Sequence, residues 1–130
     1  MLMKYDILPV PKPRMSKQDA WKKRKPVQNY WNFKAHCKLL DLKLPDGHFL
    51  VQFYLPMPKS WSKKKRSAMY LMPHKQKPDI DNLEKALLDA VYDDDAHVSH
   101  INGTKFWAET GCMIITETEH PKPLFTKFEK

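Results

Sequence analysis

Residues 77–91, KPDIDNLEKALLDAV, constrain the fold of this chain more than any other segment. The apolar residues of this segment recur at helical spacing and form one face: Leu83, Leu87, Ala90 and Val91. Such a face must pack against a core. Acidic residues gather at both ends of the predicted helix, because the seventeen positions from Asp79 to Asp95 hold seven of the fifteen carboxylates and a single base, Lys85. The fold must therefore contain a buried amphipathic helix with negatively charged ends.

The rest of the chain is basic, with a formal net charge of +8, and residues 47–78 contain seven Lys or Arg but no Asp or Glu. Two clusters combine basic side chains with a tryptophan. The first surrounds Trp21 and the second follows Trp61: Lys12, Arg14, Lys17, Lys22, Lys23, Arg24 and Lys25, then Lys63, Lys64, Lys65 and Arg66. Such surfaces suit phosphate contact and base stacking. We expect both clusters, together with Lys75 and Lys77, to bind nucleic acid, the alternatives being a solvated surface or an anionic membrane.

Length and composition predict one domain over residues 1–130, because 42% of the residues are hydrophobic and a chain of this size buries about two thirds of its unfolded surface. Cys37 and Cys112 lack the spacing of a metal site, so we expect free thiols in a reducing cytoplasm. No segment approaches the roughly 18 apolar residues of a membrane span. We therefore expect a soluble protein without a membrane partner.

Hydrophobic periodicity predicts an α+β domain in which helices pack on one β-sheet. Strands are expected at residues 5–8, 48–55, 98–107 and 112–118, and helices at 29–42, 60–71 and around the acidic segment described above. The resulting order is β, α, β, α, α, β, β. This order is typical of an α+β fold with a single sheet.

The spacing of Asp79 and Asp81 in PDIDN indicates a metal site. If this segment is extended, both carboxylates leave the same side of the chain and can share one cation. Mg²⁺ usually binds one or two protein carboxylates, and water and substrate phosphate complete its coordination. In phosphodiester hydrolysis such an ion activates water and stabilises the leaving oxygen. The sequence therefore favours a phosphodiesterase that uses Mg²⁺, with Mn²⁺ as a possible substitute, on a nucleic acid substrate.

A purely structural interpretation of the acids is that Asp81 and Glu84 form a helix capping box. This interpretation leaves Asp79 unexplained. It also leaves Asp93, Asp94 and Asp95 near the C-terminal pole of the helix, where negative charge is unfavourable. A bound cation accounts for both features.

Lys85 falls on the same helix face as Asp81, four residues earlier. It either pairs with Asp81 or Asp89, or places a positive charge near the attacked phosphate. His97 and His100 could suggest a transition-metal site, but on a strand they would point to opposite faces, which disfavours it.

The segment KPDIDNLEKALLDAV followed by DDDAHV resembles the core motif of the RusA family of Holliday-junction resolvases, a K-P-D-x-D-N-x-x-K helix start with a later Asp-Asp pair before a strand. The N-terminal PVPKPRMSKQDAW is similar to the basic segment of phage-borne members. The resemblance implies an α/β fold with a mixed sheet. It also implies a Mg²⁺-dependent homodimeric endonuclease that cuts four-way DNA junctions by paired nicks. The family's catalytic residues fall on Asp79, Asp81, Asp95 and Lys85.

The chain departs from the family pattern after the helix, because many relatives insert a few residues before the Asp pair whereas here Tyr92 runs directly into Asp93. The third ligand is therefore open between Asp94 and Asp95. We favour Asp95, since it stands three residues before Val98, which we expect to begin a strand.

These observations together predict a structure-selective DNA endonuclease of recombination and repair, acting on four-way junctions in the cytoplasm of a bacterium or a phage-infected cell. One alternative is a non-catalytic basic DNA-binding or recombination accessory protein, in which PDIDN only begins a capped helix. The other is a flap or fork nuclease with the same chemistry.

Overall fold

The computed structural model describes residues 2–15 and 24–126, and these contain four strands and three helices. In chain order they are β1 (Leu2–Tyr5), α1 (Lys25–Leu39), β2 (His48–Pro56), α2 (Lys63–Met69), α3 (Ile80–Val91), β3 (His100–Ala108) and β4 (Cys112–Thr116). The predicted order and the α+β class are confirmed. Within the described residues, no helix combines the length and apolarity needed to cross a membrane.

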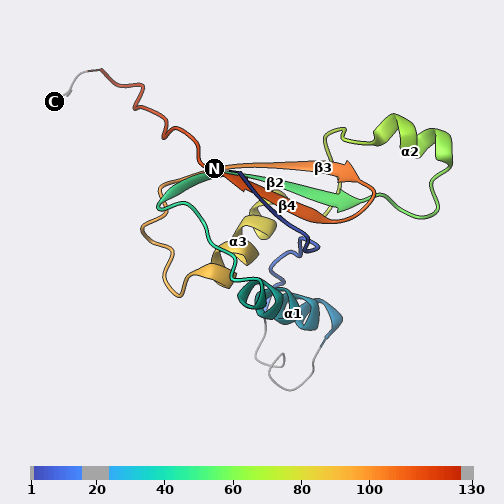
Figure 1. Cartoon of the computed structure of the whole chain (residues 1–130), viewed down its shortest axis with the longest axis horizontal. Coiled ribbons are helices and arrows are strands. Elements are labelled where there is room, and N and C mark those ends of the chain that lie inside the picture. The colour runs from blue at the N-terminus through green and yellow to red at the C-terminus, as the bar shows by residue number, and fades with distance from the viewer. Residues whose placement is uncertain (1, 16–23, 127–130) are drawn as a thin grey trace.

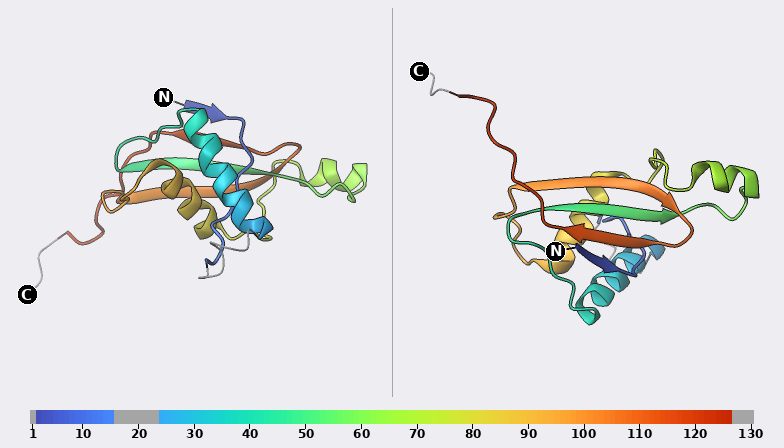
Figure 2. Two further views of the ribbon diagram at one scale, coloured as in Figure 1. Left: turned by 90° about the horizontal axis from the view of Figure 1, so that it is seen from below. Right: turned by 45° about the horizontal axis from the view of Figure 1, so that its top comes forward.

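The four strands form one mixed sheet in the order β1-β4-β2-β3. β2 and β3 are parallel neighbours, with His48 opposite His100, whereas β4 runs antiparallel to both β1 and β2. Figure 1 shows α1 and α3 on one face of this sheet, while α2 projects beyond the end of β2. Both helices run across the sheet in the left-hand view of Figure 2. The chain thus returns from the end of β2 to the start of β3 through α2 and α3.

The core lies between the sheet and the helices α1 and α3. Alternate residues of β2 are buried, as expected for a strand with one face on a core, and Phe49 and Phe53 are among the largest fully buried side chains. They share the core with Leu83 and Leu87 of α3. The predicted apolar face of this helix is confirmed, except that Val91 is only partly buried.

Several predicted boundaries were wrong by a few residues. The first strand covers Leu2–Tyr5 instead of 5–8, and it pairs there with β4. The first helix begins four residues earlier than predicted, because Pro26 fits its first turn. It ends at Leu39, shortly before Asp41 takes a left-handed conformation with φ 53. The α2 helix is shorter than predicted because Ser62 caps it, accepting a hydrogen bond from the Lys65 amide at 3.2 Å.

A small second cluster attaches α2 to the end of β3. α2 has no buried residue of its own, but Trp61, which precedes it, packs against the buried Trp107, with ring centroids 4.8 Å apart. His74 covers Trp107 at 3.9 Å. Arg66 donates hydrogen bonds to the Pro58 carbonyl at 2.9 Å and to Glu109 at 2.8 Å. These contacts fix the orientation of a helix that would otherwise lie free in solvent.

Both cysteines are free thiols, as predicted. Cys37 is buried in α1, and burial raises the pKa of its thiol to about 11, which keeps it neutral.

Leu87→Ala is expected to lower the free energy of unfolding by about 2–5 kcal/mol, because Leu87 is 1% exposed and its removal leaves a cavity between α3 and the sheet. Leu39→Ala is the matched control, since Leu39 is 83% exposed at the end of α1 and should change stability by less than about 0.5 kcal/mol. Urea denaturation followed by circular dichroism measures both. Equal losses would contradict the assignment of the core.

Candidate active site

Asp79 and Asp81 lie at the N-terminal end of α3. Asp79 is the N-cap residue, with φ −68 and ψ 143, whereas Asp81 lies in the first helical turn, and both residues are exposed. The condition that both carboxylates leave the same side of an extended chain is therefore not met, because the helix already begins at Ile80. The two carboxylates still share one end of the helix, where the helix dipole favours negative charge.

Capping does not account for these two acids. Asp79 makes no side-chain capping hydrogen bond, and Asp81 accepts one only from the adjacent Asn82 amide, at 2.9 Å. The capping box considered for Asp81 and Glu84 was therefore wrong, because Asp81 is already inside the helix. The carboxylate of Asp79 remains available to a ligand.

Glu84 lies between α3 and the sheet instead of capping the helix. Its carboxylate packs against Gly103 of β3 so closely that a Cβ at that position would collide with Oε2. Burial, and then the negative charge of Asp81, raise the pKa of Glu84. A lone glycine inside a strand is a sequence signal of such a close approach. Gly103 therefore allows the first turn of α3 to lie directly on β3.

Lys105 of β3 holds the loop that leads into α3. Its Nζ donates hydrogen bonds to the carbonyl oxygens of Gln76 at 2.7 Å and Pro78 at 2.8 Å, and its own carbonyl accepts from the His74 amide at 2.9 Å. Asp79 follows directly after the last of these fixed carbonyls. Lys105 thus fixes the backbone from which the Asp79 side chain extends. Sequence reasoning missed it, because nothing distinguishes it from any other lysine in a strand.

Lys12 anchors the loop after β1 to the same helix. Its amide donates to the Asn82 carbonyl at 2.9 Å, and its Nζ lies 2.7 Å from Asp89 Oδ2. Asp89 also accepts a hydrogen bond from the Tyr30 hydroxyl at 2.7 Å. Burial raises the pKa of Asp89, but the hydrogen bonds from Lys12 and Tyr30 outweigh it and lower that pKa. Asp89 therefore pairs with Lys12, and the alternative pairing with Lys85 was wrong.

A groove of about 740 Å³ opens beside Asp79. It lies between the loop after β1, the start of α1 and the loop before α3. Its lining consists of Val10, Pro11, Lys12, Pro13, Arg14, Lys25, Pro26, Asn29, Lys77, Pro78, Asp79 and Asn82. Asp79 is the one acid among these lining residues. The candidate metal ligand thus borders a concave, basic surface.

The residues predicted to bind DNA occupy different environments. Lys63, Lys64 and Lys65 are exposed on α2, where the Lys65 ammonium lies 4.4 Å from the centroid of the Trp61 ring. Arg66 is engaged with Pro58 and Glu109, and Lys12 with Asp89, so both have structural roles. Lys75 and Lys77 are exposed in the loop before α3, and Arg24 donates to the Arg14 carbonyl at 3.0 Å. Three predicted residues lie outside the described part of the chain: Lys17, Lys22 and Lys23.

The three consecutive aspartates lie at the opposite end of α3, which is about 18 Å long for its 12 residues. Asp94 Oδ1 accepts a hydrogen bond from the Ala96 amide, and the Asp95 carbonyl accepts one from the Val98 amide, both at 2.9 Å. These bonds form a turn, and β3 begins only at His100, so our reason for favouring Asp95 as a residue entering the strand was wrong. The carboxylate of Asp94 has an internal partner, which still distinguishes it from that of Asp95.

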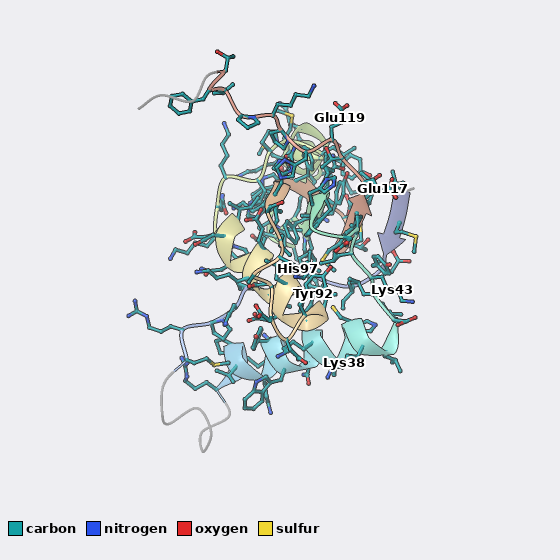
Figure 3. The ribbon with its side chains drawn as sticks, turned by 90° about the vertical axis from the view of Figure 1, so that its left-hand side faces the viewer. Lys38, Lys43, Tyr92, His97, Glu117 and Glu119 are labelled. Carbon is teal, nitrogen blue, oxygen red and sulfur yellow. The ribbon has the colours of Figure 1, made fainter. Side chains whose placement is uncertain are left out.

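Figure 3 looks onto this end of the molecule, where Tyr92 and His97 pack edge to face with ring centroids 4.6 Å apart. His97 precedes the strand, whereas His100 lies in it beside His120, with centroids 5.6 Å apart. No group of three or more His, Cys, Asp or Glu side chains that could hold a metal ion occurs in residues 2–15 and 24–126. A single chain therefore does not bring Asp95 to the two aspartates at the start of α3.

The donors at the start of α3 fit a hard divalent cation. Two exposed carboxylates, Asp79 and Asp81, supply the oxygen ligands that Mg²⁺ prefers, and this ion needs only one or two of them from a protein. The assignment of Asp79, Asp81 and Asp95 as metal ligands stays a prediction.

Lys105→Met is expected to loosen the start of α3, because two carbonyl oxygens lose their donor at about 1 kcal/mol each. Hydrogen exchange should accelerate at the Leu83 amide, which bonds to the Asp79 carbonyl at 3.2 Å, while exchange in β4 stays unchanged. Lys105→Arg retains the donors and is the control. Unchanged protection of Leu83 in Lys105→Met would contradict the role given to Lys105.

Comparison with known proteins identifies the family of this chain. The chain matches a family model described as endodeoxyribonuclease RusA over residues 6–116. It is also 39% identical over 67 residues to the uncharacterized protein YqaN of Bacillus subtilis strain 168, a match that covers 45% of this chain and 47% of that protein. The chain thus matches about half the length of this curated relative. Because the family match includes all three helices and extends through β4, this chain belongs to the RusA family of endodeoxyribonucleases.

Proposed function

We propose that this protein is a Mg²⁺-dependent endonuclease that resolves four-way DNA junctions by paired symmetric nicks, in DNA recombination and repair. One observation carries the proposal: the exposed carboxylates of Asp79 and Asp81 lie at a firmly held helix start, beside a basic groove. Membership of the RusA family supports the nuclease chemistry. A merely structural role for Asp79 would require a capping hydrogen bond that its side chain does not make.

The residues divide the chemistry among them. Asp79 and Asp81 would hold Mg²⁺, for which Mn²⁺ can substitute. When bound, such an ion polarises the phosphoryl oxygen, lowers the pKa of the attacking water and stabilises the leaving oxygen. Lys85 is exposed four residues after Asp81 and presents a positive charge to the scissile phosphate. Lys63, Lys64 and Lys65 bind the DNA backbone without taking part in the chemistry.

The working unit is a homodimer, because one chain does not gather the three aspartates. About 15 Å of helix separates Asp81 from Val91, and Asp95 follows four residues later. In a two-fold dimer the same pair of surfaces meets twice, so Asp95 of the partner subunit can complete each site. Two such sites also match the two-fold symmetry of a four-way junction that is cut by paired nicks.

Asp79→Asn and Asp81→Asn are expected to reduce Mg²⁺-dependent cleavage of a synthetic four-way junction by at least about 100-fold, since each removes a charge that holds the metal. Junction binding should stay or tighten, because the basic surface is unchanged. Gel assays with and without Mg²⁺ measure cleavage, and mobility shifts measure binding. Asp41→Asn is the control, because Asp41 is exposed and its φ of 53 suits asparagine.

If Asp79→Asn lost junction binding in parallel with cleavage, the assignment of Asp79 as a metal ligand would be contradicted. Cleavage that persists unchanged in EDTA would remove the metal from the proposal. A wild-type protein that binds junctions but never cuts them would favour the accessory-protein alternative.

Mixed dimers of Asp81→Asn and Asp95→Asn subunits are expected to regain nicking, although each homodimer is inactive. If Asp95 acts on the partner's Asp81, every mixed dimer has one intact site and one doubly altered site. About half of randomly paired dimers are mixed, so about a quarter of wild-type nicking should return, on one strand only. Differently tagged, co-expressed subunits allow this measurement. No recovery would place all three aspartates of a site in one chain.

A further inference from the structure

We propose that the groove beside Asp79 binds one unpaired nucleotide of the cleaved strand, adjacent to the scissile phosphate. The proposal rests on the proposed function, since it takes the strand held at Asp79 to be DNA. It adds a subsite and a physical reason for selectivity towards branched DNA.

Three separate segments build the groove and are tied to one another. The Lys12 amide binds the Asn82 carbonyl at 2.9 Å, which joins the loop after β1 to α3. Arg24 donates to the Arg14 carbonyl at 3.0 Å, which joins the same loop to the start of α1. The Pro78 carbonyl is held by Lys105 at 2.8 Å. The groove is therefore fixed before a ligand arrives, which lowers the entropic cost of binding.

The groove combines an apolar lining with a basic rim. Its apolar part consists of four proline rings and one valine: Pro11, Pro13, Pro26, Pro78 and Val10. Rigid proline rings pack well against flat aromatic faces, and a nucleobase is such a face. Three cations in the lining can contact phosphates: Arg14, Lys25 and Lys77. Asn29 adds an amide that can pair with the edge of a base.

Size and position identify the occupant as part of a nucleic acid strand. A volume of about 740 Å³ suits a compact ligand and does not admit a duplex. Because Asp79 lines the groove, a nucleotide inside it is continuous with the phosphate at the candidate metal site. An acidic peptide would also suit the three cations, but its carboxylates offer no flat ring to pack on the prolines.

This subsite favours branched DNA for an energetic reason. In an intact duplex, extruding a nucleotide costs a few kcal/mol of stacking and pairing, and the cost is smallest where the base is already unpaired. At a branch point, the strands exchange partners and the flanking pairs are weakened. The groove therefore binds a junction strand at lower cost than a duplex strand.

The test uses the full chain and a four-way junction carrying 2-aminopurine, a base that is quenched by stacking, at each position around the cut. In the absence of Mg²⁺, binding should raise the fluorescence at least about threefold at one position next to the scissile phosphate. The described residues that line the groove include no aromatic side chain that would quench the base again.

Asn29→Phe should fill the groove. Ala35→Phe is its matched control, because both replaced residues are exposed and uncharged on α1 and Ala35 is not among the residues that line this groove. Asn29→Phe should abolish the fluorescence rise and slow cleavage of a fully paired junction at least about tenfold, whereas Ala35→Phe should keep both. If Asn29→Phe fails to fold, Lys77→Glu replaces it and should likewise abolish the fluorescence rise. Lys59→Glu is then the control, because Lys59 is also exposed, and it should keep the rise.

Cleavage of junctions without a fluorescence rise at any position would overturn the subsite and leave the proposed function intact. A rise that survives both Asn29→Phe and Lys77→Glu would place the unpaired nucleotide elsewhere and overturn the subsite as well. A wild-type protein that neither binds nor cuts branched DNA would overturn the proposed function together with this inference.

Discussion

The parallel pairing of β2 with β3 is the constraint on which the rest of this structure depends. Parallel neighbours cannot be joined by a tight turn, so the chain must cross back over the sheet before β3 begins. α3 is part of that return path, and its start lies against Gly103 and Lys105, near the middle of β3. Its end lies near the start of β2: burial, and then the negative charge of Asp46, raise the pKa of Tyr92. Topology alone therefore separates the acids at the two ends of α3.

The start of α3 is held by interactions that do not use its own carboxylates. Lys105 binds backbone carbonyls, and Lys12 reaches α3 through the Asn82 carbonyl and through Asp89. The ammonium groups of both lysines interact with groups other than the carboxylates of Asp79 and Asp81. The loop is thus fixed while its acids stay exposed, which is the condition a cation-binding site requires. Repulsion between the two exposed acids is a cost that the surrounding positive charge and the helix dipole offset.

The sequence predicted element order and type well, because alternation in β2 and helical spacing in α3 both reflect one-sided burial. It predicted ends poorly, since the limits of β1 and α1 depend on strand pairing and on a proline that begins a helix. The sequence identified the types of residue in the candidate site but not their arrangement in space. The residues of PDIDN are compatible with either an extended or a helical segment, and the structure places the start of the helix at Ile80, inside this motif. The role of Lys105 could not be predicted from the sequence, because it binds two backbone carbonyls and every residue has one.

The separation of the aspartates gives the proposed dimer a chemical purpose beyond symmetry. If Asp95 of the partner subunit completes each site, an isolated chain lacks a full set of ligands and cannot cut. Cleavage is then conditional on assembly, which suppresses single cuts by stray monomers on duplex DNA. The proposed nucleotide subsite would add a second condition, because it would accept a nucleotide at low cost only where pairing is already weak. Two independent conditions of this kind multiply, so selectivity for a branched substrate can arise without any base-specific contact.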